Sequence, residues 1–160
     1  MNIDLRKLYD EIASDEGKVL HCYFCSEGYA TVGIGHKILP DDPENKLPVH
    51  GAYDTVPNDE GITDERCFEL FQTDVQEAVS GCERIYEKWE EFPQELKHIL
   101  INMCFQLGAG GLSAFRKMNS AAEALDYEGV AVNMVDSRWA TQQTPERAER
   151  LKTRVLALAG

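Results

Sequence analysis

The stretch LKHILINMCFQLG, residues 96–108, is apolar on nearly every side of a helix and ends at a glycine. A helix with a single apolar stripe lies on a protein surface, but a helix that is apolar all round has to be buried. Because glycine is favoured just beyond a helix end, we expect this helix to stop at Gly108. The chain must therefore surround residues 96–108 with other elements, which predicts a helical lobe built around this segment.

Further segments have the periodicity of amphipathic helices. Residues 3–13 predict a first helix that leaves Glu16 just past its end. Residues 63–81 predict a long helix whose first residue, a threonine, is the N-cap and whose first turn is acidic. A last helix is expected to begin at Pro145, with Thr144 as its N-cap.

Between the first two helices the pattern is that of strands. Residues 18–34 are rich in aromatic and β-branched side chains and are interrupted by CSEG, which predicts a turn between short antiparallel strands. Residues 39–61 hold four of the six prolines and many acidic residues, so we expect irregular surface structure with one short helical turn.

These elements predict an α+β fold that is mainly helical. The 160 residues form a single domain with two lobes. We expect a small lobe with a β-hairpin over residues 14–62, a long linking helix over residues 63–81, and a helical lobe made by residues 1–13 and 82–160.

The charge of the chain narrows the possible partners. Twenty-eight acidic and sixteen basic residues give a net charge of −12, which repels nucleic acid and anionic membrane surfaces. We find no run of about 18 apolar residues, so we expect no membrane insertion. The beginning of the chain lacks a basic segment followed by an apolar one, so we expect cytoplasmic synthesis without a signal peptide.

The cysteines and a glycine motif favour neither metal nor cofactor binding. Five cysteines are an odd number in regular segments, so we expect free thiols that are mostly buried. In CYFC, Cys22 and Cys25 would point to opposite faces of a strand, and no second ligand pair follows at zinc spacing. GIGHK lacks the third glycine of a dinucleotide-binding loop.

Three polar residues have both a chemical and a structural interpretation. Glu16, between a helix end and a hairpin, could donate a proton in glycoside cleavage, but a single exposed glutamate is more often solvated. Thr31 could orient a water molecule, or it could reflect strand propensity alone. His36 could be a general base, although a histidine paired with a helix carboxylate such as Asp74 is the commoner arrangement.

Five separated motifs, in order and at nearly the same spacing, resemble the lysozymes of T-even bacteriophages. They are DEG, EGYATVGIGH, GIT with LFQTDV, INMCFQLG and SRWATQQTPERAER. The resemblance runs from about residue 8 to about residue 150 and is weak over residues 37–61. It implies a two-lobed lysozyme-like fold and a muramidase that hydrolyses the β-1,4 bond between N-acetylmuramic acid and N-acetylglucosamine of peptidoglycan, with inversion and without a cofactor or metal.

The same resemblance implies a role for particular residues. Glu16 falls on the general acid, Thr31 on a threonine that helps to hold the attacking water, and Arg147 on an arginine that pairs with the catalytic glutamate. His36 and Asp74 fall on a buried structural ion pair.

Other positions match the part of the family that binds sugar. Phe105, Gln106 and Asn133 fall on residues that line the sugar cleft, whereas the SRW segment at residues 137–139 matches a packing region. The implied partner is the glycan strand of peptidoglycan. A protein of this kind is expected to act as a monomer, to be made in the cytoplasm of a bacterial host, and to reach the wall after a separate protein permeabilises the membrane.

Cys25 is the departure from the family pattern. The family has an aspartate at this position, as the second member of the carboxyl pair with which inverting glycosidases activate water. A Cys25 thiolate could take over that role, or Thr31 could position the water alone in a slower enzyme. The third possibility is a glycan-binding pseudoenzyme without turnover. Glu27 is the nearest alternative acid, but an alignment that uses it disturbs the match to EGYATVGIGH.

Overall fold

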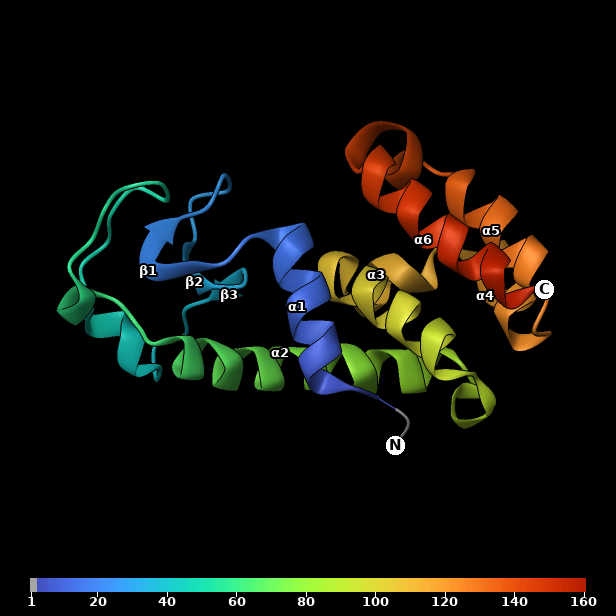
Figure 1. The fold of residues 1–160 in the computed structure, drawn as a ribbon, viewed down its shortest axis with the longest axis horizontal. Coiled ribbons are helices and arrows are strands. Elements are labelled where there is room, and N and C mark those ends of the chain that lie inside the picture. Colours follow the sequence, from blue (N-terminus) through green and yellow to red (C-terminus); the bar gives the residue numbers. More distant parts are fainter. Residues whose placement is uncertain (1–2) are drawn as a thin grey trace. The chain divides into compact units, whose positions relative to one another are not determined.

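The computed structural model describes residues 3–160, which divide into two compact units: Leu5–Asp74, and Val75–Gly160 together with the residues before Leu5. The fold is α+β and mainly helical, as the sequence predicts (Figure 1). Over residues 3–160 the elements are α1 (Leu5–Glu16), β1 (Val19–Phe24), β2 (Ala30–Gly33), β3 (His36–Lys37), α2 (Asp64–Ile85), α3 (Gln94–Ser113), α4 (Arg116–Glu123), α5 (Tyr127–Val135) and α6 (Pro145–Leu158), with short 3₁₀ and π-helical turns between them.

The first unit contains an antiparallel sheet in the order β1-β2-β3. The predicted CSEG turn joins β1 to β2, and the N–H of Gly28 donates to the carbonyl of Cys25 at 2.9 Å. Gly28 has a φ of +85°, a conformation that side chains disfavour and glycine adopts freely. The turn thus places Cys25 at the end of β1, close to the start of β2.

The segment after the sheet contains two 3₁₀ turns, Pro43–Lys46 and Asn58–Glu60, rather than the single turn expected. It is fastened to α2 by Arg66, whose guanidinium donates to both carboxylate oxygens of the buried Glu44 at 2.9 and 3.0 Å. Two planar groups joined by parallel hydrogen bonds fix orientation as well as distance. This irregular segment is therefore held in one position against the helix.

α3 is the buried helix that the apolar stretch predicts. Its residues from Leu96 to Met103 are buried, and Gly108 interrupts the helix with a φ of 76°. The helical end expected at Gly108 is present as a break, because Gly108 leaves the helical conformation and the chain then resumes helical turns to Ser113.

α2 begins as expected but ends later. The side-chain oxygen of Thr63 accepts the N–H of Arg66 at 3.0 Å, which is the predicted N-cap. The helix continues through Gly81 to Ile85 instead of stopping there. A β-carbon at Gly81 would lie 3.0 Å from the Ala109 side chain and 3.2 Å from the Cys104 sulfur, so this glycine permits close packing and does not end the helix.

Two further helix ends correct the sequence analysis. α1 reaches Glu16, so this residue is the last of the helix and does not lie beyond it. α6 begins at Pro145 as expected, but Thr144 does not cap it with its side chain. The Thr144 hydroxyl instead donates to the carbonyl of Trp139 at 3.4 Å, because the preceding π-helical turn offers that acceptor.

Over residues 3–160, no single helix combines the length and apolarity needed to cross a bilayer. Only α3 and α4 taken together have the length and apolarity of a membrane span, and the angle between these two helices is 104°.

Gly61 provides a test of how the irregular segment is attached to the sheet. A β-carbon at this position would collide with the backbone carbonyl of Leu20, which also accepts the N–H of Ile62 at 2.7 Å. We expect Gly61→Ala to lower the free energy of unfolding by about 1–3 kcal/mol, because backbone atoms cannot move aside locally. Gly110→Ala is the matched control, since a β-carbon there meets nothing within 4 Å and alanine is the better helix former. Urea unfolding of both variants measures the difference, and equal stabilities would contradict the proposed close contact.

Candidate functional site

Glu16, Cys25 and Thr31 lie in the unit Leu5–Asp74, together with Tyr23. Tyr23 stands directly opposite Thr31 in the pairing of β1 with β2, and Cys25 follows two residues later, just after the end of β1. Glu16 ends α1, shortly before β1 begins. The pKa of the Tyr23 phenol is raised first by burial and then by the negative charges of Cys25 and Glu16. Sequence reasoning missed Tyr23, although its place two residues before Cys25 puts both on one face of a strand.

Glu16 owes its position to the residue that follows it. Gly17 has a φ of +85°, and its N–H donates to the carbonyl of Ala13 at 2.8 Å. A glycine in the left-handed conformation ends a helix without steric cost. The pair Glu16-Gly17 thereby ends α1 with an exposed carboxyl group immediately before the sheet.

Cys25 lies in surroundings that favour its thiolate. The backbone N–H groups of Tyr29 and Glu27 hydrogen-bond the sulfur and lower the pKa of the thiol below its ordinary value. The Thr31 hydroxyl acts in the same direction, while partial burial and the Glu27 carboxylate act against it. Donors aimed at the charged form of a group stabilise that form. Cys25 can consequently act as an anionic hydrogen-bond acceptor at a lower pH than a free thiol.

Thr31 connects this sulfur to the sheet. The residue is buried in β2, and its hydroxyl donates to the carbonyl of Tyr29 at 2.9 Å. A hydroxyl has one proton and two lone pairs, so Thr31 can serve either the carbonyl or the sulfur as donor while it accepts a further hydrogen bond.

His36 is held by two carboxylates. Its Nδ1 lies 2.7 Å from Asp74, the partner that the sequence predicts, and its Nε2 lies 2.8 Å from Asp42. The hydrogen bond to Asp74 is the largest cause that raises the pKa of His36 to about 9; burial opposes it, and Asp42 adds to it. Sequence reasoning missed Asp42, because nothing in the pattern of an irregular segment shows which of its acids turns inward.

The remaining predicted residues belong to the other unit. Arg147 is buried, and its Nε donates to the side-chain oxygen of Asn102 at 2.8 Å. The side-chain oxygen of Gln106 accepts the indole N–H of Trp139 at 2.9 Å. Trp139, which was expected only to pack, thus orients the amide of Gln106, which was expected to line the sugar cleft.

Two other expected sugar-cleft positions lie on different helices of that unit. Asn133, on α5, donates to the carbonyl of Gly129 at 2.8 Å. Phe105 lies on α3 and is partly buried. The structure thus places Glu16, Cys25, Thr31, His36 and Asp74 in one unit, and Phe105, Gln106, Asn133 and Arg147 in the other.

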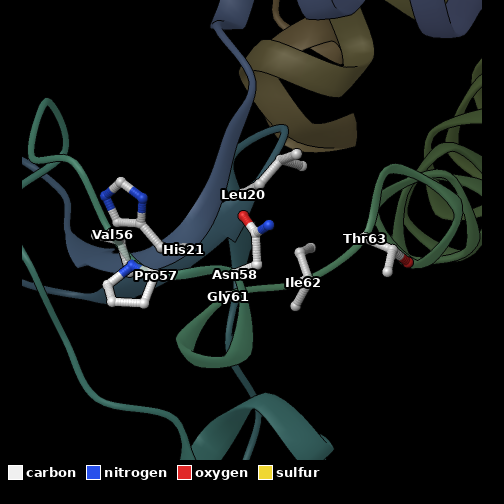
Figure 2. A pocket seen from close by; sticks show the side chains of 8 residues that line it. All are labelled: Leu20, His21, Val56, Pro57, Asn58, Gly61, Ile62 and Thr63. Carbon is white, nitrogen blue, oxygen red and sulfur yellow. The ribbon is translucent and has the colours of Figure 1, made fainter.

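Figure 2 shows a pocket of about 350 Å³ in the first unit, beside β1. It combines an apolar wall with the ring of His21 and the amide of Asn58. The residues predicted to act in catalysis do not belong to its lining, which is made by Leu20, His21, Val56, Pro57, Asn58, Gly61, Ile62 and Thr63. Across residues 3–160, no three His, Cys, Asp or Glu side chains come together as metal ligands.

The five cysteines all lie in the described part of the chain and are free thiols. Four are buried, and Cys25 is partly exposed. The thiol that the family pattern marks as unusual is therefore also the one that solvent and substrate reach most readily.

Comparison with known proteins agrees with the sequence motifs. A family model described as phage lysozyme matches residues 13–155. The chain is 31% identical over 151 residues to the pre-baseplate central spike protein Gp5 of Enterobacteria phage T4, which covers 89% of this chain and 26% of that protein. It is 29% identical over 154 residues to probable T4-type lysozyme 2 of Dictyostelium discoideum, covering 90% of both chains. Probable T4-type lysozyme 1 of the same organism is 29% identical over 155 residues, covering 89% of both.

The His36 ion pairs predict a stability that depends on pH. A histidine whose folded pKa is raised stabilises the fold fully below its unfolded pKa of about 6.5 and loses that contribution as the pH rises through about 9. We expect the difference in unfolding free energy between the wild type and His36→Gln to fall by roughly 3 kcal/mol from about pH 6 to about pH 9.5. Urea unfolding at several pH values measures this, and a difference that stays constant with pH would contradict the assigned cause.

The surroundings of Cys25 predict selective thiol reactivity. We expect iodoacetamide to alkylate Cys25 first in the folded protein, with a rate midpoint below the pH of about 8.5 typical of a free thiol. Thr31→Val should raise that midpoint, because it removes one donor to the sulfur, while Thr31→Ser should keep it. Mass spectrometry of peptides locates the label, and identical midpoints for all three proteins would rule out the hydroxyl as a cause.

Proposed function

Since the chain belongs to the phage lysozyme family and is a lysozyme-type glycoside hydrolase, we propose that it cleaves the β-1,4 bond between N-acetylmuramic acid and N-acetylglucosamine of peptidoglycan with inversion. The observation that supports this proposal is the placement of Cys25 and Thr31 where β1 ends and β2 begins, with Glu16 at the end of the helix that leads into β1. An acid, a group that accepts a proton and a hydroxyl in one place are the set that single-displacement hydrolysis requires.

Glu16 is the general acid in this proposal. Cleavage breaks the bond between the sugar C1 and the bridging oxygen, and that oxygen is a poor leaving group unless it is protonated. A carboxyl group at the exposed end of α1 can reach a bound glycan and donate the proton as the bond breaks. A carboxylate remains on Glu16 and is reprotonated by solvent.

Cys25 and Thr31 act on the attacking water. The water oxygen forms the new bond to C1 from the face opposite the leaving group, which inverts the configuration. One water proton passes to the Cys25 thiolate, whose anionic form the backbone N–H groups of Tyr29 and Glu27 stabilise. Thr31 accepts a hydrogen bond from the water while its single proton is donated either to the Tyr29 carbonyl or to the Cys25 sulfur. The Cys25 thiol then releases its proton to solvent.

The assignment of Glu16 predicts a loss of turnover without loss of the fold. We expect Glu16→Gln to lower kcat on purified peptidoglycan by at least about 100-fold, because an amide cannot donate the required proton. Glu27→Gln is the matched control: it removes a neighbouring exposed acid and should keep activity. The assay counts reducing ends, and ¹H NMR of the first product reports the anomeric configuration. Circular dichroism and urea unfolding verify that both variants are folded.

Variants at Cys25, measured in the same assay, distinguish an active hydrolase from a glycan-binding pseudoenzyme without turnover. Cys25→Asp should keep or raise activity, and Cys25→Ala should lower it, because alanine accepts no proton. If Cys25→Asp releases reducing ends and the wild type releases none, the natural protein is a glycan-binding pseudoenzyme. Full activity of Glu16→Gln would exclude Glu16 as the acid, and loss of activity in Glu27→Gln would assign that role to the neighbouring acid.

A further inference from the structure

Tyr53 is a fully exposed aromatic residue in the irregular segment that follows the sheet. A single exposed aromatic side chain is common on protein surfaces and needs no explanation by itself. Two features distinguish Tyr53: the backbone that carries it is held firmly, and its turn is tied to β1, the strand that leads to Cys25. Neither feature was evident from the sequence, where residues 39–61 show only turn-forming composition.

The turn that presents Tyr53 is closed by hydrogen bonds at both of its ends. The N–H of Asp54 donates to the carbonyl of Gly51 at 3.1 Å. The N–H of Gly51 in turn donates to the carboxylate of Asp54 at 2.9 Å. A side-chain carboxylate that accepts from a backbone N–H in this way stabilises a turn. Ala52 and Tyr53 are therefore displayed at the tip of a closed loop.

This turn is also tied to β1. Val49 forms a parallel bridge with Cys22, and the N–H of His50 donates to the Cys22 carbonyl at 2.9 Å. The ring of His21 reaches across and hydrogen-bonds the Gly51 carbonyl through Nε2 at 2.8 Å. Figure 1 shows the segment running beside β1. Three attachments to one strand give Tyr53 a defined place relative to the next residue of that strand, Tyr23.

The strand to which this turn is tied leads to the candidate catalytic groups of the same unit. Tyr23 follows Cys22 on β1, stands opposite Thr31 on β2 and comes two residues before Cys25. The pKa of the Tyr23 phenol is raised by burial, then by Cys25 and Glu16, and also by Tyr53, which agrees with this placement. A ligand that touches Tyr53 and continues along β1 would extend towards Cys25.

The chemistry of an exposed tyrosine suits a sugar ring. One face of a pyranose presents C–H groups, and the face of an aromatic ring is electron-rich, so the two surfaces attract each other. Tyrosine also loses little conformational freedom on binding, because only two side-chain torsions have to be ordered. A turn that is already closed adds little further entropic cost.

We propose that Tyr53 is a stacking surface for a sugar ring of the glycan strand and adds a binding position on the turn that is tied to β1, the strand that leads to Cys25. This inference rests on the proposed function, since it names a further binding residue for the same substrate. It assigns Tyr53 to substrate binding and not to bond cleavage, because its side chain is fully exposed and directed at no reacting group that the structure describes.

The other exposed aromatic residues of the hairpin serve as comparisons. Phe24 is 62% exposed, but it alternates with Tyr23 along β1 and so faces the opposite side of the sheet. The ring of Tyr29 is already covered by the Lys37 ammonium group, which lies 3.8 Å from the ring centre. Phe24 is therefore the matched control, because it is an exposed ring on the face of β1 opposite to Tyr23.

The experiment measures KM and kcat on soluble peptidoglycan oligosaccharides of defined length for the wild type, Tyr53→Ala, Tyr53→Phe and Phe24→Ala. We expect Tyr53→Ala to raise KM about 3- to 10-fold with kcat changed less than about twofold, since it removes one aromatic contact. Tyr53→Phe should keep the wild-type KM because the ring remains. Phe24→Ala should also keep it. Binding of the same oligosaccharides to Glu16→Gln, with and without Tyr53→Ala, measures affinity in the absence of turnover.

The outcomes separate this inference from the proposed function. A wild type that hydrolyses the oligosaccharides, together with an unchanged KM and affinity in Tyr53→Ala, overturns the role of Tyr53 and leaves the proposed function standing. An equal loss of affinity in Phe24→Ala overturns it as well, because the effect would then follow exposed aromatic area and not position. A wild type that neither binds nor hydrolyses the glycan overturns the proposed function, and the inference falls with it.

Discussion

His36 donates from both ring nitrogens to carboxylates that reach it from different segments, Asp74 on α2 and Asp42 in the irregular segment. β3 is only two residues long, so its backbone pairing with β2 is too short to hold the sheet edge by itself. The buried pair of charge-assisted hydrogen bonds supplies the missing constraint. Because Thr31 pairs with Lys37 and Val32 with His36, the position of β2, and with it the hydroxyl beside Cys25, depends on this histidine.

A thiol at position 25 can be ionised because the turn supplies hydrogen-bond donors to its sulfur, which a carboxylate would not need. An aspartate is ionised at neutral pH without help, whereas a thiol requires donors that stabilise its anion. The backbone N–H groups of Glu27 and Tyr29 and the Thr31 hydroxyl are such donors. The exposed Glu27 opposes them, so the thiolate is favoured by geometry against the local charge. The same short turn therefore shapes the hairpin and determines whether Cys25 can accept a proton.

Recognition of the glycan has to rely on contacts at short range. A net charge of −12 gives no long-range attraction towards the anionic envelope of a bacterium, so electrostatic steering contributes little to encounter. Stacking on an aromatic ring and hydrogen bonds to sugar hydroxyls are insensitive to net charge. The proposed stacking on Tyr53 suits such recognition, because hydrogen bonds already close the turn that carries it and tie that turn to β1.

The sequence by itself determined the local elements, because their signals lie within a few neighbouring residues: the buried helix around residues 96–104, the break at Gly108, the CSEG turn and the N-cap at Thr63. It also indicated Glu16, Cys25, Thr31 and the His36–Asp74 pair, through motifs at family spacing. Tertiary structure alone decided which distant groups meet. The sequence around Gly81 predicts a helix end, but the helix continues and this glycine permits close packing against Cys104 and Ala109. The Thr144 hydroxyl donates to the carbonyl of Trp139 in the preceding turn and does not cap α6. Asp42 lies only six residues from His36, yet no periodicity or local composition of the irregular segment shows that this acid turns inward, so packing selects the contact.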